Sequence, residues 1–330
     1  MIRMQKKIHL LAFMFIALIF IFSSCDLFTE QSNQGTRSSR TATGKGVEIS
    51  FARNIPPDII YVDGEHNPNI KFEVVVDIRN LGAYPKLGSG SLNGKIFLTG
   101  FDADLIEGGN WVGGNQFNLI EAVSDDLPEG GVLQKNFVAN GIYYPYRSRE
   151  YPINLVLTAC YYYETEALGS VCIDPNPASL DNKVCEFDDV KLSEQLAPVQ
   201  VTRIQQSGTS NQLILTIDIK NLGSGVVLRE FAREGQGVLA DGRCLNLGYD
   251  DADRLGLEIE IVGIGKGDCR PMGVFRDPIR LFDDAAQVIC TFQLPEDITS
   301  EFSSQMNIKL NYGYLTSETK QIKIVNLDVR

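Results

Sequence analysis

Cysteine is the residue type in this chain whose number and spacing most clearly indicate chemistry. None of the six cysteines after Cys25 is spaced as a Cys-x-x-Cys pair, which argues against a zinc site or a thioredoxin-like redox centre. An even number in an exported chain instead predicts disulfides. We favour Cys172–Cys185, which brackets a Pro/Asp/Asn loop, and Cys269–Cys290. Cys160 and Cys244 then stay free or pair with each other between domains.

The seventh cysteine, Cys25, ends an apolar segment. Three basic residues precede the nearly unbroken apolar run 8–22, which is too short for a comfortable membrane span and typical of a signal peptide. Phe22-Ser23-Ser24-Cys25 resembles the lipobox of bacterial lipoproteins, with Phe where Leu is usual. The resemblance implies cleavage after residue 24 and a lipid on the Cys25 thiol. The alternatives are an uncleaved anchor, or a Cys25 that is simply the first cysteine of the mature chain.

The charge of the chain limits its partners. Loss of residues 1–24, which hold three basic and no acidic residues, changes the formal net charge from −12 to −15. An acidic surface of this size disfavours nucleic acid and anionic lipid headgroups as partners. The membrane is therefore expected as a partner through the N-terminal anchor only.

Histidine is nearly absent, which excludes large classes of enzyme. Only His9, inside the signal, and His66, in a polar turn, occur. Serine and cysteine nucleophiles usually need a histidine base, and catalytic zinc usually needs histidine ligands. Carboxylates are abundant, so a two-carboxylate hydrolase stays open, although nothing singles out a pair. No cofactor is predicted.

Three kinds of side chain are candidates for binding. The acidic loop Asp250-Asp251-Ala252-Asp253 offers oxygen ligands for calcium but lacks the pattern of an EF-hand, and a solvated turn is favoured. Trp111, in a glycine-rich loop, could stack a sugar, and packing on its own sandwich is favoured. The tyrosine clusters 143–146 and 161–163 could form an edge that pairs with another chain, and ordinary strand packing is the default.

The residues after position 45 follow a pattern of short strands between turns. Val74, Val76 and Ile78 alternate with polar residues, which is the period of a half-buried strand. Pro and Gly clusters separate such segments, and no segment has a long helical period. The sequence therefore predicts an all-β body.

Two phrases recur along the chain and predict two homologous domains. Residues 76–82 match residues 217–223, and the shared Asn-Leu-Gly predicts a strand end where Asn bonds the turn and Gly takes a positive φ. Tyrosine-bearing segments 157–173 and 308–324 predict a hairpin that closes each sandwich. We predict a signal peptide at 1–24, a flexible tether at 25–45, β-sandwiches at 46–175 and 197–330, and a linker at 176–196.

These motifs resemble those of a known class of surface module. Asn221-Leu222-Gly223 after an apolar strand resembles the strand end of CARDB-like and other immunoglobulin-like adhesion modules. Asn80-Leu81-Gly82-Ala83-Tyr84, Thr99-Gly100-Phe101-Asp102 and Cys160-Tyr161-Tyr162-Tyr163 resemble uncharacterised archaeal cell-surface proteins with tandem domains of this kind. The resemblance implies two tandem immunoglobulin-like β-sandwiches and carries over no catalytic residue.

Taken together, these features predict a lipid-anchored extracytoplasmic protein of the cell envelope. We expect it to act by binding or as a building block, without chemistry of its own. Its expected partner is an envelope component or another copy of itself. The alternatives are a carboxylate-based surface hydrolase and a metal- or ligand-binding lipoprotein.

Overall fold

The computed structural model describes residues 44–86, 92–107, 111, 114–118, 120–145, 147–179, 182–229, 245–271 and 278–329. Nearly all regular structure in these residues is β, with one short 3₁₀ turn at Ala103–Leu105 (η1), so the all-β prediction is confirmed. None of the helices in this part of the chain is long and apolar enough to cross a membrane. All described residues belong to one compact unit.

The first half of the chain forms short strands and ends in one very long strand. β1, β4 and β8 form one sheet in that order, β3, β9 and β6 form a small sheet, and β5 and β7 join the sheet that contains β10. The bounds are β1 Val47–Phe51, β2 Ile59–Val62, β3 His66–Asn67, β4 Phe72–Asn80, β5 Gly94–Thr99, β6 Ile106–Glu107, β7 Asn115–Phe117, β8 Val132–Ala139, β9 Gly141–Tyr143 and β10 Glu150–Ile173.

The second half repeats this plan and also ends in a long strand. β11, β12, β18 and β16 form one sheet in that order, while β14 and β13 pair with β19. The bounds are β11 Val199–Thr209, β12 Gln212–Asn221, β13 Val226–Leu228, β14 Arg254–Ile261, β15 Gly265–Lys266, β16 Asp268–Arg270, β17 Ile279–Arg280, β18 Ala285–Gln293 and β19 Phe302–Asn326.

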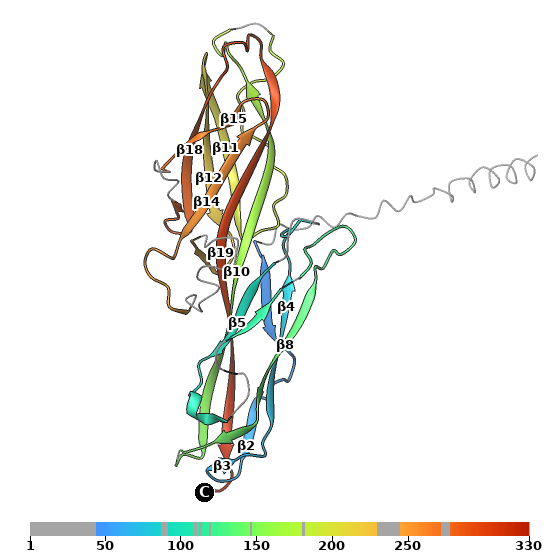
Figure 1. Ribbon diagram of the computed structural model, residues 1–330, viewed down its shortest axis with the longest axis vertical. Coiled ribbons are helices and arrows are strands. Elements are labelled where there is room, and N and C mark those ends of the chain that lie inside the picture. The colour runs from blue at the N-terminus through green and yellow to red at the C-terminus, as the bar shows by residue number, and fades with distance from the viewer. Residues whose placement is uncertain are drawn as a thin grey trace, which may run out of the picture. The chain divides into compact units, whose positions relative to one another are not determined.

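The two long strands β10 and β19 pair with each other over their whole length. Their antiparallel register runs without a break from Glu150↔Val325 to Cys172↔Ser303 and Ile173↔Phe302. Figure 1 shows the two strands side by side through both halves of the described body. One backbone ladder therefore connects the two halves.

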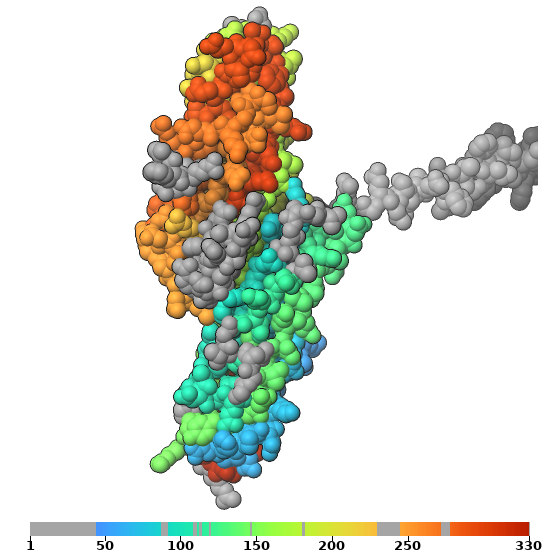
Figure 2. Space-filling view, in the orientation of Figure 1, coloured from blue at the N-terminus to red at the C-terminus, as the bar shows by residue number. Residues whose placement is uncertain are grey.

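Each half receives part of its sheet from the other half. The first part of β10 pairs with β5, whereas the last part of β19 pairs with β2, from the beginning of the chain. Figure 2 shows this neighbourhood as red C-terminal atoms among blue N-terminal ones. The first part of β19 pairs with β14 in the second half. The predicted ranges 46–175 and 197–330 therefore do not hold two self-contained sets of strands.

The predicted closing hairpins are wrong, because both tyrosine-bearing segments are single continuous strands. Neither segment contains an Asn-Gly or Asp-Gly turn that would reverse the strand. The predicted linker 176–196 forms backbone hydrogen bonds with strands of both halves. Val190 donates its N–H to the Ile204 carbonyl (2.9 Å), and Ser193 donates to the Leu168 carbonyl (2.8 Å).

Alternation of apolar and polar residues builds the core. In β12, Leu213, Leu215, Ile217 and Ile219 are buried while their neighbours are half-buried or exposed. Burial of such a side chain contributes about 1.5–3 kcal/mol. One apolar cluster takes residues from the strands of both halves, which joins them by packing as well as by the ladder.

Candidate functional site

Four tyrosines meet at the middle of the β10–β19 ladder. The register places Tyr161 opposite Tyr314 and Tyr163 opposite Tyr312. Ring centroids lie 5.8 Å apart in the first pair and 5.9 Å in the second. All four side chains are buried. We call these four residues the tyrosine junction.

The first two hydroxyls of the junction bind backbone groups of the first half. The Tyr161 hydroxyl accepts the Val47 N–H at 3.0 Å. The Tyr163 hydroxyl accepts the Tyr84 N–H at 3.3 Å and donates to the Leu196 carbonyl at 3.1 Å. These bonds attach the β10 tyrosines to β1 and to the turn after β4.

The other two hydroxyls repeat this arrangement in the second half. The Tyr312 hydroxyl accepts the Val199 N–H at 3.3 Å, at the start of β11, just as Tyr161 binds the start of β1. The Tyr314 hydroxyl accepts the Gly225 N–H at 2.9 Å and donates to Asn221 Oδ1 at 3.0 Å. The repeat in the sequence thus corresponds to a repeat of contacts at the junction.

The recurring Asn-Leu-Gly phrase positions the turns that contact these tyrosines. Asn80 Oδ1 accepts the Gly82 N–H at 3.1 Å, and Asn221 Oδ1 accepts the Gly223 N–H at 3.2 Å. Neither glycine has a positive φ, so that part of the prediction is wrong. Both are required for space, because an added Cβ would overlap the Tyr163 hydroxyl at Gly82 and the Tyr314 hydroxyl at Gly223.

The electrostatics of the junction fit a structural role. Burial raises the pKa of Tyr161, Tyr163 and Tyr312, and it raises the pKa of Tyr314 to about 12. The hydroxyls therefore keep their protons at neutral pH and already have backbone or side-chain partners. The junction is suited to joining the two halves rather than to proton transfer.

A polar pocket of about 240 Å³ lies next to the junction on the other face of β10. Glu164 and Glu166 both line it, since residues two apart on a strand point to the same face. Only 15% of each side chain is exposed. We call this the glutamate pocket.

Glu164 and Glu166 each have a cationic neighbour, and the exposed Glu194 is a third carboxylate in the lining. Lys309 Nζ lies 3.4 Å from Glu164 Oε1, and Lys86 pairs with Glu166. Asn307 Nδ2 also donates to Glu166 Oε1 at 3.1 Å. A glycosidase needs one carboxyl group that holds a proton for the leaving group. Two ion-paired glutamates are poorly arranged for that step.

The acidic loop does not gather its oxygens around one point. Asp250 Oδ1 lies 3.0 Å from Arg254 Nη2, and Asp251 Oδ2 accepts the Gly248 N–H at 2.9 Å. These are the contacts of a turn with a local ion pair. Across the described ranges, no group of three or more His, Cys, Asp or Glu residues could hold a metal ion.

Trp111 and His66 have structural contacts. Trp111 is 2% exposed, and its ring packs against Phe72 (4.7 Å between centroids) and Phe101 (5.1 Å). It therefore packs on its own half and is not available to stack a sugar. His66 Nδ1 lies 3.0 Å from Glu107 Oε1, and the histidine side chain is 64% exposed.

The tyrosine clusters do not form an edge. Tyr161, Tyr162 and Tyr163 lie in β10, which β5 and β19 flank on its two sides. Tyr144 is buried, and its hydroxyl donates to the Ser148 carbonyl at 3.0 Å. Ordinary packing accounts for these residues, and Tyr146 of the first cluster lies outside the described residues.

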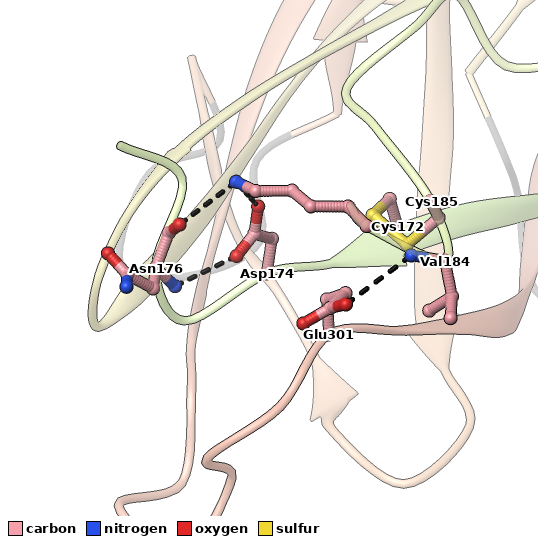
Figure 3. A network of polar contacts seen from close by, with 7 residues as sticks. Cys172, Asp174, Asn176, Val184, Cys185 and Glu301 are labelled. Atoms are coloured by element: carbon pink, nitrogen blue, oxygen red, sulfur yellow. Dashed lines mark hydrogen bonds and ion pairs between the residues drawn. A yellow bond between two sulfur atoms is a disulfide. The ribbon is translucent and has the colours of Figure 1, made fainter. Parts of the chain in front are cut away.

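The structure contains both disulfides that the sequence favoured. Cys172–Cys185 closes a loop in which the carboxylate of buried Asp174 pairs with Lys183 at 2.7 Å. Figure 3 shows the disulfide and the polar contacts around Asp174. Cys269–Cys290 links directly opposed residues of β16 and β18. Cys160 is also disulfide-bonded, so the alternative of a free thiol is wrong. Cys25, the predicted lipidation site, and Cys244 lie outside the described residues.

Sequence reasoning missed the cationic groups that face these sites. Glu164 and Glu166 carried a usable signal, because they alternate with Thr165 in a strand pattern. Their partners Lys86 and Lys309 come from distant segments, so no local pattern identifies them. The arginines around Asp250, described below, were missed for the same reason.

Comparison with known proteins gives little guidance. No family model matches the chain. No curated protein matches it either. Among solved structures, the CupB6 tip adhesin from Pseudomonas aeruginosa is similar at 8% identity and a TM-score of 0.20, over 85% of this chain and 97% of that chain. A TM-score this low supports no inference about fold or function.

Proposed function

We propose that this protein is anchored outside the cytoplasm by a lipid on Cys25 and acts by binding or as a structural component of the cell surface. In this proposal it catalyses no reaction, and its partner is an envelope component or a second copy. The resemblance to tandem CARDB-like modules of archaeal surface proteins supports this class of function. The proposal includes two immunoglobulin-like sandwiches joined by the exchanged strands.

The disulfides are the observation that carries the proposal. Cys172–Cys185, Cys269–Cys290 and the bonded Cys160 are three separate cysteine sites, all oxidised. Structural disulfides persist in oxidising compartments and are rare in the cytosol. This agrees with the secretion signal predicted before Cys25.

The construction of the body also favours a mechanical or binding role. The β10–β19 ladder spans both halves, and the tyrosine junction attaches each half to its centre. Two side chains that would serve a hydrolase, Glu164 and Glu166, are engaged in ion pairs. A stiff body beyond a tether is suited to presenting surfaces to a partner.

Metabolic labelling with a radioactive or clickable palmitate tests the anchor. We expect the wild type to incorporate label and to fractionate with membranes, whereas Cys25→Ala should lose the label. Mass spectrometry of the mature N-terminus should place the lipid on residue 25. Recovery of unprocessed, unlabelled protein from the cytosol would refute the proposal.

The hydrolase alternative is tested at the glutamate pocket. A panel of chromogenic glycosides and esters should give no turnover above that of Glu164→Gln and Glu166→Gln. Turnover by the wild type that both variants abolish would establish the alternative. Chemical crosslinking on cells, with Cys25→Ala as the control, then identifies the surface partner.

A further inference from the structure

A second pocket, of about 530 Å³, lies in the second half of the chain. It is lined by Arg229, Asp250, Arg254, Pro271, Pro278, Arg280 and Phe282. Its volume falls within the roughly 300–1,000 Å³ of small-molecule sites. We call it the arginine pocket.

The strand register brings two of these arginines face to face. Arg254 begins β14, Arg280 ends β17, and the two are direct partners in the β14–β17 pair. Like charges directly opposite each other in a sheet are destabilising. Among the described residues, the lining has three arginines and one aspartate, a net charge of +2, in a chain whose net charge is −12. A bound anion would reduce the repulsion between these like charges.

Asp250, the one acidic side chain among the described lining residues, does not pair with all of the arginine donors. Asp250 bonds only Nη2 of Arg254, at 3.0 Å. Arg254 Nε is buried and has no hydrogen-bond partner. An unpaired buried donor, more so a charged one, costs free energy that a bound acceptor would recover. No carboxylate of the described residues forms an ion pair with Arg229 or Arg280.

Two aromatic rings lie close to the Arg280 guanidinium, and one of them, Phe282, also lines the pocket. The Arg280 guanidinium lies 3.8 Å from the Tyr249 ring centroid and 5.7 Å from that of Phe282. Tyr249 is 74% exposed and Phe282 71%. A stacked guanidinium keeps the N–H groups at its edge available in a defined plane, which suits bidentate binding of an oxyanion.

We propose that the arginine pocket binds the carboxylate or sulfate group of an acidic oligosaccharide. The oxyanion takes the donors of Arg254, Arg280 and Arg229, and a sugar ring packs on the exposed aromatic surface of Phe282. The lining offers one cluster of donors for a single oxyanion, and not the extended basic surface on which nucleic-acid binding depends. The proposal deepens the binding function proposed above and rests on it, and the affinity assay below reads the pocket independently of the anchor.

Titration calorimetry of the purified full chain in detergent tests the pocket with two sources of the anion. Oligogalacturonate supplies carboxylates and a heparin-derived oligosaccharide supplies sulfates, while methyl-esterified oligogalacturonate is the uncharged control. We expect binding of at least one acidic ligand and none of the ester. Failure of both acidic ligands to bind, or equal binding of the ester, overturns the proposal whatever the result of the palmitate experiment.

Four variants separate this site from general charge attraction. Arg280→Gln should weaken binding about tenfold or more, because it removes charge-assisted hydrogen bonds to the oxyanion. Arg254→Lys, which keeps the charge but loses the fork, should also weaken it. Arg203→Gln removes an equal charge, from an exposed pair with Asp189, and should leave affinity unchanged.

The fourth variant should act in the opposite direction. Asp250→Asn removes the carboxylate that competes for Arg254, so it should tighten binding severalfold. Thermal unfolding of each variant verifies that it is folded. If Arg254→Lys fails to fold, the variants at the half-buried Arg280 and the exposed Asp250 still test the pocket. Weaker binding by Asp250→Asn, or equal losses in Arg203→Gln and Arg280→Gln, would overturn the assignment.

Discussion

Tyr314→Phe isolates one hydrogen-bonding group at the centre of the protein. The hydroxyl accepts the Gly225 N–H at 2.9 Å and donates to Asn221 Oδ1 at 3.0 Å, in a residue that is 3% exposed. Asn221 Oδ1 keeps a second donor, the Gly223 N–H, whereas the Gly225 N–H loses this acceptor. A buried donor left unsatisfied costs about 1–3 kcal/mol. We therefore expect the free energy of unfolding to fall by about 2 kcal/mol.

Equilibrium unfolding in guanidinium chloride, followed by circular dichroism, measures this change from the midpoint at constant slope. Tyr143→Phe is the matched control, because its hydroxyl binds Glu65 at 2.7 Å on the surface. Removal of that exposed hydroxyl should change the free energy of unfolding by no more than about 0.5 kcal/mol. Equal effects of the two substitutions would refute the role given to the junction.

A double-mutant cycle with Gly223→Ala makes the test stricter. The added Cβ would overlap the Tyr314 hydroxyl, so Gly223→Ala alone should destabilise by about 1–3 kcal/mol. In the Tyr314→Phe background part of this overlap is gone, and the cost should fall by at least about 0.5 kcal/mol. Strict additivity would show that the glycine is needed for some reason other than this tyrosine.

Three further predictions concern the turns, the disulfides and the buried phenols. Asn221→Ala removes an acceptor of the Gly223 N–H and a donor to the Gly225 carbonyl (2.9 Å), so it should lower the free energy of unfolding by about 2–3 kcal/mol in the same denaturant assay; a loss no larger than that of Tyr143→Phe would contradict this. Replacing both cysteines of Cys172–Cys185 or of Cys269–Cys290 by alanine opens loops with sequence separations of 13 and 21 and should cost about 3 kcal/mol each, read from thermal and denaturant unfolding; unchanged midpoints would refute it. Stability should fall as pH rises from about 10, because the unfolded tyrosines lose protons that the native ones keep; Tyr161, Tyr163, Tyr312 and Tyr314 together give a slope of up to about 5 kcal/mol per pH unit. Tyrosinate absorbance measures the ionisation of the tyrosines, and denaturant midpoints measure the stability at each pH. Tyr314→Phe should reduce the slope of stability against pH by about 1.4 kcal/mol per pH unit. No reduction would show that Tyr314 has an ordinary pKa in the native state.

Local patterns were sufficient to predict the strands and part of the cross-linking. The alternation of Val74, Val76 and Ile78 predicted β4, because one face of that strand is buried and the other is half-buried or exposed. Cys172 and Cys185 were paired correctly because the bracketed loop is short. The repeated Asn-Leu-Gly phrase identified two equivalent turns, although the reason for its glycine was wrong.

Contacts between distant segments were beyond sequence reasoning. Glu164 and Lys309 face each other because β10 and β19 pair, and neither residue carries a local sign of its partner. The same is true of Arg254 and Arg280, whose register follows from the β14–β17 pairing. Both candidate pockets depend on such pairings, so no motif could have identified them.

The sequence by itself determined that this chain is a β protein with an N-terminal apolar segment, paired cysteines and an internal repeat, because alternation, composition and spacing are local properties. Tertiary structure decided that the halves exchange their long strands and that Gly82 and Gly223 make room for tyrosines. A strand with the burial pattern of β10 satisfies its backbone equally well beside a hairpin partner or beside β19. Only the packing of the whole chain selects between those partners, and that choice assembles the tyrosine junction and the arginine pocket.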